Sequence, residues 1–441
     1  MTTIELGEVT EDAVTPPMPV NIPRLRRAAL AVLAAAGLLA LGGSAHPPPA
    51  GVHPLWSTPL RSGESWSLSA DTAYLSRLDD KVSAYNLTTG ELRWNVPAGA
   101  DLSGDFGATG PQPLGDLVLV PADPKVITLE QPDGSLHFFM TIRTTIALDA
   151  TTGDERWRTS GQATSYGNAG PLLISEDEDN ARTIRLRLVR AADGTDIWNR
   201  SIPPAQSWTP ILDGDRPVAI ATVTPDGLVT VYDYATGKPR RSLRLPDTDT
   251  GQRYTALMSA GGNLVVMRDR EAGTETTVYR PDDLRALWHT TQQTAYLTEC
   301  GEMVCAIGDG VIIGHDPQTG RQTWQLPGMR DMTMVGPNRM VVTGDLATGD
   351  NFLVEPSSGQ TVHGPIVGRL VTRQGQAGTP TFLRPAAEPP GRLAVVTVDL
   401  ADGTEHKLGT VPAITTEDIC TTADGYLACV RGGALEITAV G

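Results

Sequence analysis

The 441-residue sequence has few basic residues and few cysteines. Lys and Arg together number 35 against 51 Asp and Glu, which gives a formal net charge of −16. A protein that binds nucleic acid needs a basic face, so this charge balance argues against a nucleic-acid partner. The four cysteines include no C-x-x-C spacing and no adjacent pair, which disfavours a thiol redox site.

Sequence motifs of the common enzyme classes are also missing. The chain has no G-x-S-x-G nucleophile elbow, no phosphate-binding P-loop and no H-E-x-x-H zinc motif. Its seven histidines are scattered. We therefore expect no catalytic residue, no metal ligand set and no cofactor.

What the sequence does contain is a repeated turn. In the clearest copy, Thr145–Trp157, an apolar run ends at Asp149, the chain turns up to Gly153, and Trp157 follows four residues later. An Asp carboxylate can accept hydrogen bonds from the turn backbone, and Gly can adopt the positive φ that such turns need. The pattern predicts a strand, a tight turn and a second strand.

Several other segments keep the same frame. The Gly position recurs at a spacing near 40 residues, with one Leu in place of Gly: Gly90, Gly153, Gly194, Gly237, Leu284, Gly320, Gly359 and Gly403. Five copies carry a Trp four residues further on: Trp94, Trp157, Trp198, Trp288 and Trp324. A period of about 40 residues with several strands per repeat is typical of a β-propeller.

The two ends of the repeat region indicate how the ring closes. Leu55–Leu60 resembles the Trp-bearing strands but has no partner hairpin before it, while three strands between Ile419 and Val440 end the chain. Pairing the first strand with the last three would remove the exposed sheet edges. We predict an all-β protein, a β-propeller of about eight four-stranded blades. A literal count gives one split blade more, unless a weak copy near Leu284 or Gly359 forms no full blade.

The first interval between turns is longer than the others. It spans 63 residues, from Gly90 to Gly153, and the excess falls within Pro121–Met140. The strand-like runs Ile127–Leu129 and Leu136–Phe139 predict an extended hairpin that projects from the second blade. Such an insertion either carries recognition, as insertions on one face of repeat proteins often do, or is a decorative loop.

The cysteines fall into two pairs, each flanking a predicted hairpin turn: Cys300 with Cys305, and Cys420 with Cys429. We expect Glu302-Met303 and Asp424-Gly425 as the two-residue turns, which places the members of each pair opposite one another. Directly opposed strand residues come within reach of a disulfide. In an exported protein the spacing predicts two structural disulfides, each within one blade.

The N-terminal segment predicts a membrane anchor. Residues 1–23 are acidic and proline-bearing, and we expect a disordered cytoplasmic tail. Residues 24–45 start with an Arg cluster and continue without charge, which suits a transmembrane signal-anchor helix with a cytoplasmic N-terminus. The alternative is a signal peptide cleaved after Gly43–Ala45. In both cases residues 46–54 form a proline-rich linker, and 55–441 form a propeller outside the cell membrane.

The repeated D-x-x-T-G-x-x-x-W pattern resembles the PQQ-like repeat, with its best copies at Ser83–Trp94, Thr145–Trp157 and Val311–Trp324. This repeat is the blade unit of quinoprotein alcohol dehydrogenases and of non-enzymatic propeller scaffold lipoproteins of outer-membrane assembly. The resemblance covers about residues 55–441, and the front end looks like that of membrane-anchored bacterial members. It implies that the Trp residues pack between neighbouring blades: Trp94, Trp157, Trp198, Trp288 and Trp324.

The enzymatic chemistry of the family is not visible in the sequence. Quinoproteins hold PQQ and Ca²⁺ in the central channel beside a catalytic Asp, and many carry a disulfide between adjacent cysteines. No such cysteines and no matching catalytic segment occur here. We therefore expect a non-catalytic, membrane-tethered binding or scaffold module for a protein or cell-envelope ligand. The alternatives are a PQQ-dependent dehydrogenase and a sugar- or cell-wall-binding propeller.

Overall fold

The computed structural model describes residues 51–102, 110–130, 136–166, 170–177, 184–203, 205, 207–246, 254–270, 273–291, 296–344, 349–373, 378–415 and 419–441. The chain divides into two units, Met1–Ala50 and Gly51–Gly441, and the description concerns the second. The expected tail 1–23 and helix 24–45 lie outside the described residues. Within the described part of the chain, no helix combines the length and apolar character that crossing a bilayer needs.

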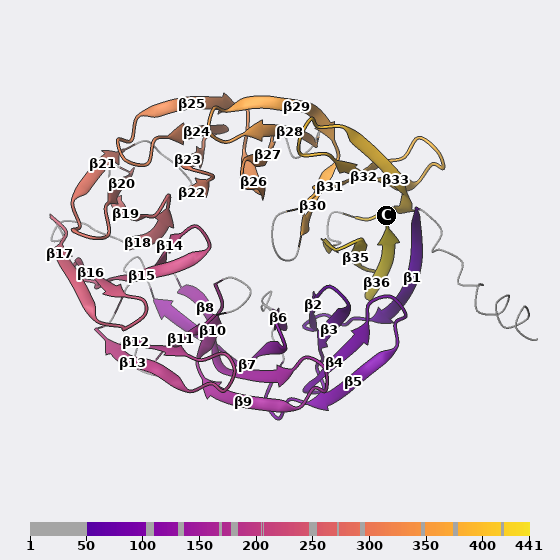
Figure 1. Cartoon of the computed structure of the whole chain (residues 1–441), viewed down its shortest axis with the longest axis horizontal. Helices are drawn as coiled ribbons and strands as arrows, with labels where there is room; N and C mark the ends of the chain where they lie inside the picture. Colours follow the sequence, from indigo (N-terminus) through magenta and orange to yellow (C-terminus); the bar gives the residue numbers. More distant parts are fainter. Residues whose placement is uncertain are drawn as a thin grey trace, which may run out of the picture. The chain divides into compact units, whose positions relative to one another are not determined.

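The described part of Gly51–Gly441 is a ring of antiparallel four-stranded sheets, the blades of a propeller (Figure 1). Blades 1 to 4 follow one another along the chain: β2 (Ser65–Leu68), β3 (Thr72–Ser76), β4 (Lys81–Asn86) and β5 (Leu92–Pro97); β6 (Gln112–Leu114), β7 (Leu117–Glu130), β8 (Leu136–Asp149) and β9 (Glu155–Ser160); β10 (Gln162–Thr164), β11 (Leu172–Asp177), β12 (Ile184–Val189) and β13 (Asp196–Ile202); β14 (Ser207–Asp213), β15 (Arg216–Val223), β16 (Leu228–Asp233) and β17 (Pro239–Arg244).

Blades 5 to 8 repeat the arrangement: β18 (Tyr254–Ala260), β19 (Asn263–Arg270), β20 (Gly273–Tyr279) and β21 (Ala286–Thr290); β22 (Tyr296–Cys300), β23 (Met303–Gly308), β24 (Val311–His315) and β25 (Gln322–Pro327); β26 (Asp331–Gly336), β27 (Arg339–Thr343), β28 (Asp350–Glu355) and β29 (Gln360–Val367); β30 (Arg369–Arg373), β31 (Thr381–Pro385), β32 (Arg392–Val398) and β33 (Glu405–Pro412). Blade 9 combines both ends of the chain: β34 (Ile419–Ala423), β35 (Tyr426–Arg431), β36 (Ala434–Val440) and β1 (Val52–Pro59).

The expectation of about eight blades was wrong, because the described residues form nine. The weak repeats around Leu284 and Gly359 both belong to complete four-stranded sheets, β18–β21 and β26–β29. Neither the loss of one Gly nor the loss of one Trp prevents a blade from forming, since the strands are held by their own backbone pairing. The split blade is therefore a ninth blade.

The ring closes as predicted, through the pairing of the first strand with the last three. Antiparallel pairing of β1 with β36 runs from Val52 opposite Val440 to Pro59 opposite Ala434. The strand starts earlier than expected, so residues 52–54 belong to the propeller and not to the linker. His53 and Pro54 pair with Ala439 and Thr438 of β36, so this part of β36 is not an exposed sheet edge.

The hydrophobic core lies between the blades. In blade 1 the second strand, β3, is buried along its whole length, whereas the fourth strand, β5, exposes every residue except Trp94 and the half-buried Val96. A strand flanked by blades on both of its faces buries side chains on both. Successive apolar clusters fill these spaces, for example Val82 and Trp94 of blade 1 with Val118 and Ile146 of blade 2.

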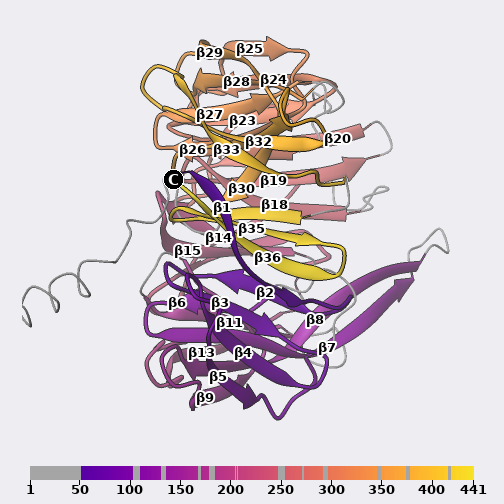
Figure 2. The same ribbon diagram turned by 90° about the vertical axis from the view of Figure 1, so that its right-hand side faces the viewer.

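Blade 2 carries a hairpin longer than any other in the described chain. The strands β7 and β8 have 14 residues each, and their register continues outward to Glu130 opposite Leu136. Figure 2 shows the two strands reaching beyond the rest of the propeller. The predicted extended hairpin is thus confirmed, although residues 131–135 lie outside the described ones. We call residues 121–130 and 136–143 the arm.

The arm defines two faces of the propeller. The arm leaves the side that we call the arm face, and the repeated turns such as Asp149–Gly153 follow the opposite ends of the strands, on the side that we call the turn face. Val52 pairs with Val440, and the C-terminus lies on the side opposite the arm (Figure 2). The chain therefore enters and leaves the propeller at the turn face.

Candidate functional site

The repeated turn is organised by its Asp. Asp149 Oδ1 accepts hydrogen bonds from the backbone N–H groups of Thr151 and Thr152 at 2.8 and 2.9 Å. Gly153 closes the turn at φ +78°, and Arg156 Nε donates to Asp149 Oδ2 at 3.1 Å. The Arg156 hydrogen bond and then the two backbone N–H groups lower the pKa of Asp149 to about 2.

The five tryptophans that the resemblance singled out lie between neighbouring blades. Each indole Nε1 donates to the carbonyl oxygen of the residue three positions before the turn Gly of the next blade: Trp94 to Ala150 (3.1 Å), Trp157 to Ala191 (2.7 Å), Trp198 to Tyr234 (2.8 Å), Trp288 to Pro317 (3.1 Å) and Trp324 to Pro356 (2.9 Å). The ring covers the turn Gly, so that a Cβ on Gly153 would lie 2.7 Å from Trp94 Cδ2. Glycine is required there by the ring as well as by φ.

Sequence reasoning missed a further docking residue, Trp56. Its Nε1 donates to the Leu87 oxygen at 2.8 Å, and a Cβ on Gly90 would lie 2.6 Å from its ring. This contact joins blade 9 to blade 1 across the closure of the ring. The signal was present, because Leu55–Leu60 resembles the Trp-bearing strands.

The junction of blades 4 and 5 lacks both members of the Trp–Gly pair. Arg241 stands at the Trp position and is exposed, and Leu284 stands at the Gly position with φ +54° and 5% exposure. The inner strands meet instead, since Leu257 N–H donates to Ser207 Oγ at 3.1 Å. These two blades therefore share one apolar cluster that includes Leu284.

Two other junctions also lack Trp. Between blades 7 and 8, Arg339 Nε donates to the Leu400 oxygen at 2.7 Å, the carbonyl that corresponds to the indole acceptor at the other junctions. His363 lies over Gly403 in place of the Trp ring. Between blades 8 and 9, a short parallel pairing of β30 with β34 joins the inner strands into one continuous sheet.

Both predicted disulfides are confirmed, with Cα–Cα distances of 5.8 Å for Cys300–Cys305 and 4.1 Å for Cys420–Cys429. Each links the first and second strands of its blade, and all four cysteines are buried. The expected turn at Glu302-Met303 was wrong. Cys300 pairs with Met303, so the turn is Gly301-Glu302, because Gly301 adopts φ +65°.

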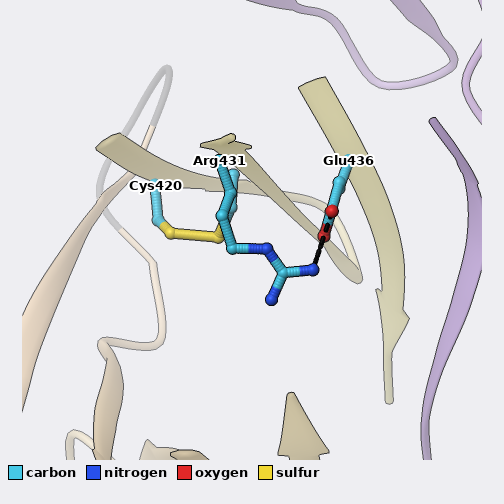
Figure 3. Close-up of a disulfide and its surroundings, with 4 residues drawn as sticks. Cys420, Arg431 and Glu436 are labelled. Atoms are coloured by element: carbon cyan, nitrogen blue, oxygen red, sulfur yellow. Dashed lines mark hydrogen bonds and ion pairs between the residues drawn. A yellow bond between two sulfur atoms is a disulfide. The ribbon is translucent and has the colours of Figure 1, made fainter. Parts of the chain in front are cut away.

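An ion pair lies beside the second disulfide (Figure 3). Glu436 stands opposite Cys429 in the sheet, and Arg431 Nη2 donates to Glu436 Oε1 at 2.7 Å. Both side chains are partly exposed. The ion pair links β35 to β36, the two middle strands of blade 9, and its opposite charges neutralise each other.

The polar groups on the inner strands are dispersed over several blades. Tyr296 donates to Asp331 Oδ1 at 3.1 Å, between blades 6 and 7. Burial raises the pKa of Glu299, with a smaller contribution from the charge of Asp215. Within the described residues, no group of three or more His, Cys, Asp or Glu side chains could hold a metal ion.

The arm is the remaining candidate, and its two edges differ. Along the base of β7, Asp123 N–H donates to the Asp101 oxygen at 2.7 Å, so the segment before blade 2 covers that edge. On the other edge, β9 pairs with β8 only from Thr144 onward, followed by Gly161 N–H to the Arg143 oxygen at 2.7 Å. No described strand pairs with the outer edge of β8 from residue 136 to 142.

One family model matches the chain over more than half of its length. The family model described as outer membrane protein assembly factor BamB matches residues 49–138 and 137–279. No curated protein matches the chain.

Solved structures of propellers resemble the chain at low identity. BamB from Moraxella catarrhalis is 14% identical with a TM-score of 0.42, covering 88% of this chain and 99% of that one. The designed protein Ika8 is 11% identical with a TM-score of 0.43, covering 89% and 100%. Quinohemoprotein alcohol dehydrogenase from Comamonas testosteroni is 11% identical with a TM-score of 0.41, covering 88% and 76%. At these values the likeness carries no argument about activity.

Proposed function

The chain belongs to the family described as outer membrane protein assembly factor BamB, and on that premise we propose that it is a non-catalytic binding or scaffold module. The proposal includes the anchor expected at residues 24–45, which would tether the propeller on the outer side of the cell membrane. Its ligand would be a protein or another component of the cell envelope.

The observation that carries the proposal is the arm. A two-stranded ribbon that leaves its sheet gains little stability by itself in water. This one extends well past the residues that β6 and β9 pair with, and Val126 on it is 48% exposed. Insertions that project from one face of a repeat protein often carry recognition.

The route of the chain supports the same reading. The N-terminal end enters the propeller at the turn face, and the arm leaves from the arm face. Within the propeller, the arm and the strand end at Val52 are therefore on opposite faces.

Calorimetry on the full chain in detergent micelles tests the non-catalytic proposal. We expect no binding of PQQ, with or without Ca²⁺, at high micromolar concentrations. Stoichiometric binding of PQQ that depends on Ca²⁺ would contradict the proposal and favour the quinoprotein alternative.

The membrane tether is tested separately by fractionation of cells that express the full chain. We expect the chain in the membrane fraction, resistant to extraction with carbonate, and degraded by external protease down to its N-terminal part. Release of an intact propeller that lacks residues 1–45 would instead favour the cleaved signal peptide.

A further inference from the structure

We propose that the outer edge of β8, residues 136–142, binds an extended strand of a partner protein by strand addition. This inference rests on the proposed function, because it names the way in which the arm would hold a ligand. Strand addition needs an exposed edge whose backbone N–H and C=O groups have no partner.

Two hydrogen bonds at the base of the arm show which backbone groups point outward. Arg143 presents its carbonyl oxygen to Gly161, away from β7. Backbone groups alternate in direction along a strand, so the outward residues of β8 are Thr141, Phe139 and His137. On β7, Asp123 lies across from Arg143, and its N–H donates to Asp101, also away from the partner strand. The odd-numbered residues of both strands therefore direct their backbone groups outward.

The two edges of the arm are not equally suited to this role. On β7 the outward positions start with Pro121, which has no N–H, and continue with Asp123, whose N–H is already bonded and whose φ is +53°. Proline and irregular backbone protect an edge against pairing. The β8 edge, from 136 to 142, reads LHFFMTI and contains no proline and no glycine. The geometry therefore points to β8.

The position of the edge also determines the form of the partner. An added strand would continue the line of β9, which ends at Ser160, and would run antiparallel to β8. The open length is seven residues, or about 24 Å at 3.4 Å per residue. The pairing uses backbone groups, so the added segment must offer an N–H group at each position that faces β8. The expected partner is an extended, proline-free protein segment of about seven residues.

A bilayer surface is a poorer occupant of the same edge. Unpaired backbone N–H and C=O groups find no hydrogen-bond partners in hydrocarbon, whereas an added strand satisfies them. A row of outward backbone groups therefore favours a protein over a lipid.

The test uses a phage-displayed library of random twelve-residue peptides, selected against the full chain in detergent micelles. Phe139→Pro removes one outward N–H of β8. Ile127→Pro is the matched control, because Ile127 lies directly opposite Phe139 and its N–H points outward from β7. Phe139→Val changes the side chain and keeps the N–H. Proline is tolerated on an edge strand where the N–H faces solvent, so the variants should keep the fold.

We expect Phe139→Pro to weaken the selected peptides at least tenfold, and the two controls to change the affinity less than threefold. Bound peptide should also slow hydrogen exchange at the amides of His137, Phe139 and Thr141. Should Phe139→Pro lower the urea midpoint, Thr141→Pro replaces it, because that residue presents the next outward N–H.

Three results would overturn the proposal. The first is a library that yields no peptide above background, and the second is equal weakening by Phe139→Pro and Ile127→Pro. The third is a dimer of the full chain, detected by sedimentation, that Phe139→Pro dissociates, since the occupant would then be a second copy. None of these results changes the PQQ calorimetry, so failure of the strand-addition proposal is distinguishable from failure of the proposed function.

Discussion

Arg241 of blade 4 and Leu284 of blade 5 stand at one blade junction in the positions that Trp and Gly occupy at other junctions, and Leu284 is buried whereas Arg241 is exposed. The two replacements depend on one another. A Cβ at the Gly position of a Trp-bearing junction meets the indole ring, whereas the residue at the Trp position opposite Leu284 in the repeat is Arg241. At this junction the contact between the inner strands β14 and β18 takes the place of the Trp–Gly contact near the outer strands.

Because the Trp94 ring covers the turn, we predict that Gly153 cannot be replaced by a larger residue without loss of stability. We expect Gly153→Ala to lower the free energy of unfolding by about 2–4 kcal/mol, because it adds a collision with Trp94 to the cost of a positive φ. The matched control is Gly214→Ala, at φ +59° with no atom within 4 Å of its added Cβ. It should cost about 1–2 kcal/mol, the φ penalty alone. Equal losses in urea unfolding would show that the ring plays no part.

At the junction of blades 7 and 8, Arg339 donates the hydrogen bond that a Trp indole donates at other junctions, and we predict that this bond stabilises the protein. We expect Arg339→Met to destabilise the protein by about 1–3 kcal/mol, because the Leu400 oxygen loses its hydrogen bond while part of the apolar stem is kept. Arg216→Met is the control, since the ion pair of Arg216 with Asp213 is solvent-exposed. Exposed pairs contribute about 0–1 kcal/mol. If both variants unfold at the same urea concentration, Arg339 does not stabilise the junction.

The turn carboxylate predicts a loss of stability in acid. The pKa of Asp149 is lowered to about 2 in the folded protein, below its unfolded value of about 3.9. The resulting stabilisation is complete above the unfolded pKa and is lost as pH falls from about 4 through 2. Arg156→Met removes the largest cause of the shift.

We therefore expect the wild-type protein to lose more of its urea midpoint than Arg156→Met between pH 5 and pH 2. Parallel pH curves for the two proteins would mean that Arg156 does not set the pKa of Asp149.

The disulfide of blade 9 predicts a redox dependence of stability. We expect Cys420→Ala with Cys429→Ala to destabilise the protein by about 2–3 kcal/mol, from the chain entropy of the nine-residue separation. The double variant Cys300→Ala, Cys305→Ala is the comparison, because its disulfide lies in a blade that is not split between the chain ends. We expect it to lower the free energy of unfolding by about 2 kcal/mol, since the two cysteines are five residues apart. A reductant should lower the urea midpoint of the wild type and leave a variant without all four cysteines unchanged. Any shift in that variant would assign the effect to something other than the disulfides.

The sequence by itself determined the architecture of the repeat. Asp149, Gly153 and Trp157 have roles that are local or recur at a fixed period, so the turn, its strands and the propeller class follow from the pattern. The Cys420–Cys429 pair was also predictable, because Asp424-Gly425 defines its hairpin. Trp56 was recognisable from the strand around it, although its partner Leu87 was not.

Tertiary structure alone decided the blade number, the turn between Cys300 and Cys305, and the joining of the junctions without Trp. A weak repeat such as the one around Leu284 still makes a blade, because backbone pairing and neighbouring blades supply what the missing Gly and Trp would have contributed. Arg339 reaches Leu400 across 61 positions of sequence, and no local pattern marks such a contact. The open edge of β8 likewise follows from where β9 ends, since an edge is defined by the strand that is absent beside it.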